Sequence, residues 1–236
     1  MLSLSPHTHD AALPTVLSAT ALRLMPFERD VATSSELKSI SHIHLAGPGD
    51  TCLIHRCDLN RNDETVAPSE AALFGLIPSW ACDARSASQN CVVHVGAIAN
   101  KPAYRSALQH AQFCWLSVAY FLGSVWKNGR EHPVRIQRVD DTPLHLAGIW
   151  SEWVLDNGTP VLSFCLLTRD MDTQLQTLGV RLGQGLSQCY AAFNPCDLVD
   201  WLHQPVEQVL HTLGGIQLPP LRITPHQITD RPRYVT

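Results

Sequence analysis

The stretch that decides the fold is Leu73-Phe74-Gly75-Leu76-Ile77-Pro78-Ser79-Trp80-Ala81, together with Lys101-Pro102-Ala103-Tyr104-Arg105 further along the chain. The first segment predicts an apolar strand, carrying Gly75 to Ile77, that ends in a proline turn and presents Trp80. Taken alone, it is typical of a packing motif. The second segment predicts a helix that starts at Pro102, because a first-turn proline loses no hydrogen bond. That helix is expected to run to about His110.

Composition permits one substantial core and argues against a generally basic surface. The chain has 236 residues, of which 45% are hydrophobic, so we expect a single domain over residues 1–236. Only 16% are charged and the formal net charge is −4. This balance gives no global positive field for nucleic acid, so any binding to phosphates would need a local cluster of cations.

Targeting and metal signals are weak. No window reaches the apolar length needed to span a bilayer, and the first residues lack a basic head followed by an apolar block. A cytoplasmic protein without a membrane partner is therefore expected. None of the eight cysteines forms a C-x-x-C pair, and most lie in apolar runs. We expect buried reduced thiols, no metal site and no cofactor.

Turn signals in the middle of the chain define the architecture. Asn128-Gly129 and Asn157-Gly158 are hairpin signatures, and Asp140-Asp141-Thr142-Pro143 marks a turn between them. They predict a four-stranded antiparallel meander over residues 113–126, 133–139, 144–154 and 160–168. Further expected elements are a helix within 10–26, extended pieces over 42–57 broken at Gly47-Pro48-Gly49, an extended segment over 92–99, a short helix from Asn194-Pro195 to near Leu202, and a helix from Val206 closed by Gly214-Gly215. The class is α+β with mainly antiparallel strands.

Several segments occur in the order of one known family. They are Gly75 to Ala81, Lys101 to Arg105, Ala147-Gly148-Ile149-Trp150, Leu166-Leu167-Thr168, Asp200-Trp201-Leu202 and Leu221 to Thr224. They correspond to Trp-Gly-Leu-Ile-Pro-x-Trp, Lys-Pro-x-Phe-Arg, Ala-Gly-Leu-Trp, Leu-Thr-Thr and the C-terminal segments of the family. The chain resembles the SRAP (SOS response-associated peptidase) family, which senses abasic sites in single-stranded DNA. The resemblance implies coiled, mainly antiparallel sheets that form a barrel-like core with a few peripheral helices.

The reactive residues of that family are replaced in this sequence. The family nucleophile is the cysteine exposed after removal of Met1, and Leu2 occupies this position. The family asparagine falls at Val92, the glutamate at Val125 and the histidine at Gly179. Valine and glycine cannot transfer protons. The resemblance therefore implies a catalytically degenerate member in which no catalytic residue is intact.

On the DNA-facing side the resemblance implies partial retention. Phe74 replaces a stacking tryptophan and still offers a π face, and His94 replaces an arginine and would contact a phosphate only when protonated. The full set of candidates is Pro48, Phe74, His94, Lys101, Arg105, Trp126, Thr168 and Arg181. For Lys101 and Arg105, capping the helix end or pairing with acids is the alternative role.

Three functions remain open at this point. The first is a non-catalytic module that binds single-stranded or abasic-site DNA without a covalent crosslink. The second is a protein-interaction or scaffold module whose old cleft is filled by apolar side chains. The third is an enzyme with relocated residues, in which Cys91 or Cys114 is the nucleophile and His94 the base. An extended strand would place Cys91 and His94 on opposite sides, which disfavours the third function.

Overall fold

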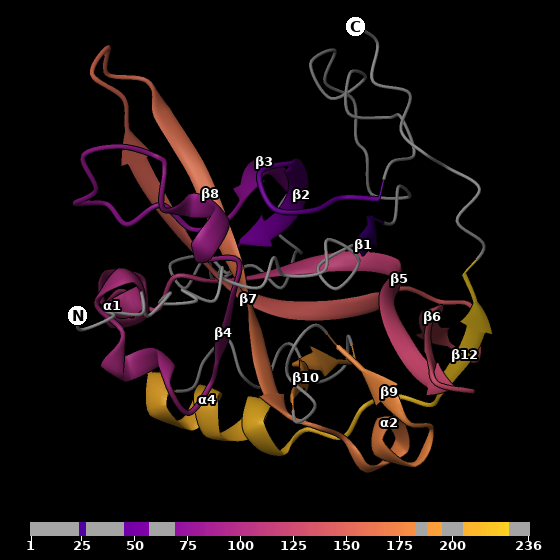
Figure 1. The fold of residues 1–236 in the computed structure, drawn as a ribbon. Helices are drawn as coiled ribbons and strands as arrows, with labels where there is room; N and C mark the ends of the chain where they lie inside the picture. The colour runs from indigo at the N-terminus through magenta and orange to yellow at the C-terminus, as the bar shows by residue number, and fades with distance from the viewer. Residues whose placement is uncertain (1–23, 27–44, 57–68, 183–187, 195–204, 227–236) are drawn as a thin grey trace, which may run out of the picture.

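The computed structural model describes residues 24–26, 45–56, 69–182, 188–194 and 205–226, shown in Figure 1. The strands are β1 (Leu24–Pro26), β2 (Thr51–Arg56), β3 (Ser69–Phe74), β4 (Val92–His94), β5 (Phe113–Lys127), β6 (Arg130–Arg138), β7 (Leu144–Val154), β8 (Pro160–Asp170), β9 (Val180–Arg181), β10 (Gln188–Tyr190), β11 (Ala192–Phe193) and β12 (Leu221–Pro225). The helices are α1 (Pro102–Gln109), α2 (Thr173–Thr177) and α4 (Val206–Gly215).

A closed ring of strands forms the core. β5 pairs with β7, β7 with β8, β8 with β3, β3 with β2, and β2 with β5 again. These pairings are antiparallel except for β3–β8, where Phe74 lies opposite Phe164 in parallel register. The predicted α+β class, with mainly antiparallel strands, a barrel-like core and peripheral helices, is confirmed.

The meander prediction is correct for the strands and wrong for one pairing. All four strands occur within a few residues of the predicted limits. However, β7 does not lie beside β6. The first half of β5 pairs with β7 from Phe113 to Val118, and its second half pairs with β6 from Phe121 to Lys127. A strand of fifteen residues is long enough to pair within the barrel at one end and to form a separate hairpin with β6 at the other.

Local turn chemistry agrees with the sequence. Asn128 and Gly129 have φ values of 50° and 73°. Two successive residues with positive φ form the tight turn whose twist matches the strands on either side. β5 and β6 therefore meet in a two-residue hairpin, with Lys127 paired to Arg130 at its tip.

The two longer helices lie where they were predicted. α1 begins at Pro102, and α4 ends at Gly215. Their buried side chains, among them Tyr104, Val209 and Leu213, belong to one hydrophobic cluster on the outside of the barrel. The two helices therefore cover the outer face of strands β7 and β8.

Other segments correct the expectations. β4 ends at His94, and residues 98–100 form a short helical turn, so the segment 92–99 is not extended throughout. Leu24–Pro26 is a strand that pairs with β5, whereas a helix was expected within 10–26. Gly47–Gly49 forms the predicted break before β2. The remainder of 10–26 and of 42–57, and the expected helix from Pro195 to Leu202, lie outside the described residues.

The deciding stretch acts as a packing motif. β3 ends at Phe74, so Gly75 to Ile77 are not part of the strand, as had been expected. Gly75 has φ +131°, and a Cβ built there would lie 2.4 Å from the carbonyl oxygen of Ala87. Leu76 and Ile77 are buried, and the Ile77 amide donates to Ser163 Oγ at 2.9 Å. The chain therefore turns sharply after β3, and the residues that follow are buried beside β8.

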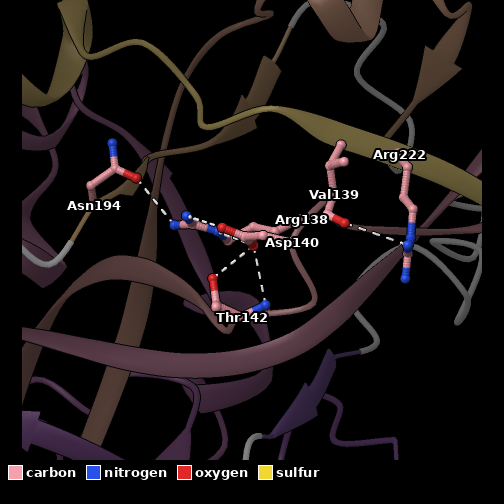
Figure 2. A network of polar contacts seen from close by, with 6 residues as sticks. All are labelled: Arg138, Val139, Asp140, Thr142, Asn194 and Arg222. Carbon is pink, nitrogen blue, oxygen red and sulfur yellow. Dashed lines mark hydrogen bonds and ion pairs between the residues drawn. The ribbon is translucent and has the colours of Figure 1, made fainter.

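A polar network joins the β6–β7 turn to β12 and to Asn194, which follows β11 (Figure 2). The Arg138 guanidinium donates to Asp140 at 2.7 and 3.0 Å and to Asn194 Oδ1 at 3.1 Å. The Thr142 amide and hydroxyl also donate to Asp140. Arg222 of β12 donates to the Val139 carbonyl and forms an ion pair with Asp141. The network therefore ties β12 and the segment after β11 to the end of β6.

We expect an Asp140→Asn variant to be less stable than the parent at pH 7, with a difference that narrows steadily as the pH falls from about 4 to 2. The Arg138 side chain, and then the Thr142 hydroxyl and amide, hold the pKa of Asp140 well below its ordinary value. A depressed folded-state pKa gives stabilisation that is complete above the unfolded-state pKa of about 4 and is lost as the pH falls. Urea midpoints of both proteins across pH 2–7 measure the effect. A pH-independent difference would contradict it.

Candidate functional site

Two positions where the resemblance implies reactive residues lie close together, one on β5 and one directly before β9. Val125 of β5 pairs with Val180 of β9, and Gly179 comes directly before Val180. Val125 is 7% exposed and belongs, with Val180, to a hydrophobic cluster that includes residues of the barrel strands and of β6. Gly179 is exposed, with φ +67° and open space where a side chain would point. Neither position carries a group that can donate or accept a proton.

The third described position borders the same cluster. Val92 of β4 is half-buried and packs against the cluster that contains Val125 and Val180. Leu2, the fourth position, lies outside the described residues. Among the described residues, the places of the family asparagine and glutamate are thus occupied by apolar side chains that contact one hydrophobic cluster. Such a surface excludes water and offers no partner to a polar substrate.

The prediction for Phe74 needs correction. Its ring is 0% exposed and lies parallel to Phe164, with ring centroids 5.1 Å apart. Alternation along β3 turns Phe74 into the barrel together with Ala72. A ring enclosed in this way has no face available for stacking on a base, so Phe74 is a core residue.

An exposed aromatic ring and several cations gather at the β5–β6 hairpin. Trp126 is 54% exposed, and the Arg181 guanidinium lies 5.3 Å from its ring centroid. Lys127 and Arg130 pair at the exposed tip of the same hairpin, where strand alternation turns them to the face opposite Trp126. Glu131 lies opposite Trp126 in the β5–β6 register, on the same face of the hairpin, and accepts a hydrogen bond from Ser124. We call Trp126, Lys127, Arg130 and Arg181 the hairpin patch. Its ring can stack on a planar group, and its three cations can bind anions.

A second polar group surrounds the end of β4. His94 Nε2 lies 3.3 Å from Asp170 Oδ1, and His94 Nδ1 accepts a hydrogen bond from the Gly96 amide. Thr168, which lies opposite His94 in the β4–β8 register, is buried and donates to Gln188. His94 therefore faces a carboxylate, and Thr168 is engaged with a neutral amide.

The remaining candidates lie elsewhere. Lys101 and Arg105 are exposed on α1, and neither forms an ion pair with a described residue or caps the helix through its side chain. Figure 1 shows α1 and β9 on opposite sides of the molecule. Pro48 is exposed in the turn before β2. The structure thus brings Trp126 and Arg181 together but does not bring Lys101 and Arg105 to them.

The sequence reasoning missed Lys127, Arg130 and Asp170. The first two had an available signal, because they flank the Asn-Gly turn directly before and after it. Asp170 had none, since its position beside His94 depends on the parallel pairing of β4 with β8. Local sequence does not indicate that β4 and β8 are partners.

The relocated-enzyme hypothesis lacks an activated thiol among the described residues. Burial raises the pKa of Cys91 to about 12, and its Sγ lies 3.2 Å from the Ser88 carbonyl oxygen. His94 is engaged with Asp170 and Gly96 rather than with Cys91. Cys114 is completely buried. A thiol with a raised pKa holds almost no thiolate at neutral pH and is a poor nucleophile.

Within the described part of the chain, no three His, Cys, Asp or Glu side chains lie close enough together to hold a metal ion. Over the same residues, no helix has the length and apolarity required to cross a membrane.

Comparison with known proteins identifies the family. The family model described as "SOS response associated peptidase (SRAP)" matches residues 21–219. The chain therefore belongs to the SRAP family, which associates it with the SOS response. No curated protein matches the sequence.

Solved structures share the fold at low sequence identity. A Bordetella bronchiseptica protein matches with 16% identity and a TM-score of 0.70, covering 88% of this chain and 100% of the other. A Bacteroides thetaiotaomicron protein matches with 15% identity and a TM-score of 0.64, covering 84% of each chain. A phage-related protein from Bordetella bronchiseptica has 15% identity and a TM-score of 0.53, covering 87% of this chain and 94% of the other. These likenesses concern the fold alone.

Proposed function

We propose that this SRAP-family chain binds single-stranded DNA, including DNA with abasic sites, without forming a covalent crosslink. The observation that carries the proposal is the exposed Trp126 ring with Arg181 above it, on a hairpin whose tip carries two further exposed cations. Bases splayed from a single strand can stack on such a ring, while guanidinium and ammonium groups contact phosphates. A duplex would keep its bases stacked internally and would lose this contribution.

The absence of crosslinking chemistry follows from the residues at the family positions. The nucleophile position is Leu2, which has no thiol, and Val125 and Gly179 replace the proton-transfer groups. Val125 is enclosed in the apolar cluster, so a water molecule cannot readily substitute for the missing carboxylate. DNA that reaches this surface therefore stays intact and dissociates.

The binding is expected to be weak and sensitive to salt. The net charge of −4 opposes long-range attraction, so the affinity depends on the three cations of the hairpin patch. Three phosphate contacts to a single strand predict a slope of about −2 in log K against log salt concentration. Fluorescence polarisation with a labelled dT₁₂ strand between 20 and 200 mM NaCl measures this slope, and a duplex of equal length is the control.

A parallel incubation with an abasic-site strand tests the covalent step. We expect no adduct on a denaturing gel, even after long incubation. Recovery of a stable protein–DNA adduct would contradict the degenerate chemistry, and no detectable binding at 20 mM NaCl would contradict the DNA-binding proposal.

An interaction module is the second candidate, favoured by the apolar filling at Val92, Val125 and Val180. In that case the family frame is retained to present a surface to a protein, and the hairpin patch has no role in binding DNA. The dT₁₂ titration separates the two functions, because this candidate predicts no salt-dependent binding to the strand.

A further inference from the structure

A second arginine lies over an aromatic ring further along the β5–β6 hairpin. The Arg135 guanidinium of β6 is 4.8 Å from the centroid of the Tyr120 ring of β5. Arg135 Nε also donates to His226 Nδ1 at 3.0 Å. Tyr120 and Arg135 are both half-buried, so part of each side chain reaches the surface. The arrangement repeats that of Arg181 over Trp126 near the tip of the hairpin.

Strand register places the two arginine–aromatic pairs on the same face of one sheet. β5 and β6 pair without a bulge over residues 121–127 and 130–136. Side chains that are an even number of residues apart on a strand share a face, so Tyr120 and Trp126 point to the same side. Val125 points to the other side, where it belongs to the hydrophobic cluster. The rise of a strand separates the two rings by about 20 Å.

This face keeps a net positive charge. Arg135 and Arg181 form no ion pair with any carboxylate among the described residues. Glu131 lies on the same face and accepts a hydrogen bond from a serine of β5. Arg222 of β12 is paired with Asp141. Two arginines therefore remain against one carboxylate, and a guanidinium group without an acid partner is available to a phosphate.

We propose that Tyr120 and Arg135 form a second subsite for the single strand that binds at Trp126. A base contacts the exposed part of the Tyr120 ring, and Arg135 contacts the adjoining phosphate. This inference rests on the proposed function and deepens it, because it extends the footprint from the hairpin tip along β5. The slope of about −2 is that of the hairpin patch alone, and a fourth phosphate contact brings it to about −3 for dT₁₂.

The first test compares Arg135→Gln with Arg105→Gln, which removes an exposed arginine from α1 and changes the net charge equally. Figure 1 shows α1 on the opposite side of the molecule from β6 and β12. We expect Arg135→Gln to bind dT₁₂ about fivefold more weakly than the parent at 20 mM NaCl, with a salt slope shallower by about 0.7, the value for one phosphate. Arg105→Gln should match the parent in both respects.

The second test locates the bases directly in the unmodified protein. A dT₁₂ strand that carries one 5-iodouracil is irradiated in the complex, and the modified residues are identified by mass spectrometry. We expect adducts at both Trp126 and Tyr120. In Arg135→Gln the Tyr120 adduct should fall while the Trp126 adduct persists, and in Arg105→Gln both should persist. Adducts at Trp126 without any at Tyr120 in the parent would overturn the second subsite.

The outcomes separate the two proposals. If the parent binds with a slope of about −2, Arg135→Gln equals Arg105→Gln and Tyr120 is not modified, the second subsite fails and the proposed function stands. If the parent does not bind dT₁₂ at 20 mM NaCl, the proposed function fails and the inference falls with it. Urea midpoints of the variants show whether Arg135→Gln is folded. If it is not, the adducts formed by the parent decide the question.

Discussion

A Trp126→Ala variant should lose single-stranded DNA binding by about tenfold or more, since base–aromatic stacking contributes about 1–3 kcal/mol per base. The ring is half exposed and projects from a hairpin outside the barrel, so its removal should leave the core intact. It also removes the surface on which Arg181 rests, which leaves that guanidinium less well positioned for a phosphate. Polarisation with dT₁₂ at 20 mM NaCl measures the loss.

The matched control for this variant is Trp80→Ala. Trp80 is also exposed, at 64%, but it lies in the turn near the end of the deciding stretch and not on the hairpin patch. We expect its removal to leave binding within about twofold of the parent, because a residue outside the footprint contributes little. Equal losses in both variants would show that a general aromatic effect, and not the hairpin patch, holds the strand.

Gly75→Ala should destabilise the protein by on the order of 3–5 kcal/mol, among the largest effects of a single substitution. The added Cβ would meet the Ala87 carbonyl oxygen at 2.4 Å, and φ at this position is +131°. The backbone fixes the position of the Cβ, and the Ala87 oxygen is itself a backbone atom, so no side-chain rotation relieves the contact. Moving the chain apart would also strain the hydrogen bond from the Gly75 amide to the Phe164 carbonyl, now 2.9 Å.

A Gly158→Ala variant tests whether the loss of stability in Gly75→Ala comes from the steric contact or from the positive φ. Gly158 also has a positive φ, of +81°, but nothing lies within 4 Å of a Cβ built there. This substitution should cost about 1 kcal/mol, the usual penalty for a side chain at positive φ. Urea unfolding of both variants gives the comparison. Similar losses for the two glycines would mean that the close approach of Ala87 is relieved easily.

Short-range chemistry explains which parts of the fold were predictable. The Pro102 helix start, the Asn128-Gly129 turn and the Gly215 helix end each depend on the φ preference or hydrogen bonding of one or two residues. Such preferences are present in the sequence itself. The strands between these signals could therefore be placed to within a few residues.

Partner choice between strands was not predictable in the same way. β7 pairs with the first half of β5 because barrel closure covers the edges of an apolar strand buried on both faces. Closure also decides that Phe74 faces inward onto Phe164. The sequence showed an aromatic residue next to a turn, but the side on which it lies depends on a parallel contact with β8.

The candidate site was predictable only in part, for the same reason. Trp126 and Arg181 were both recognised, and the β5–β9 pairing that joins them comes from strands far apart in the chain. His94 was recognised as well. Its role changed because Asp170 reaches it through the β4–β8 pairing, which no local pattern indicates.

The two pairings that close the ring of strands, β2–β5 and β3–β8, have a consequence for how the protein folds. They join His55 to Trp115 and Phe74 to Phe164, residues that are remote along the chain. Contacts between residues so far apart in the sequence form slowly, because the chain loses loop-closure entropy before the contacts stabilise the fold. The β5–β6 and β7–β8 hairpins can assemble early, while β2 and β3 must await both of them. Until then the facing edges of β3 and β8 are both unpaired, so intermolecular association competes with productive folding at these two edges.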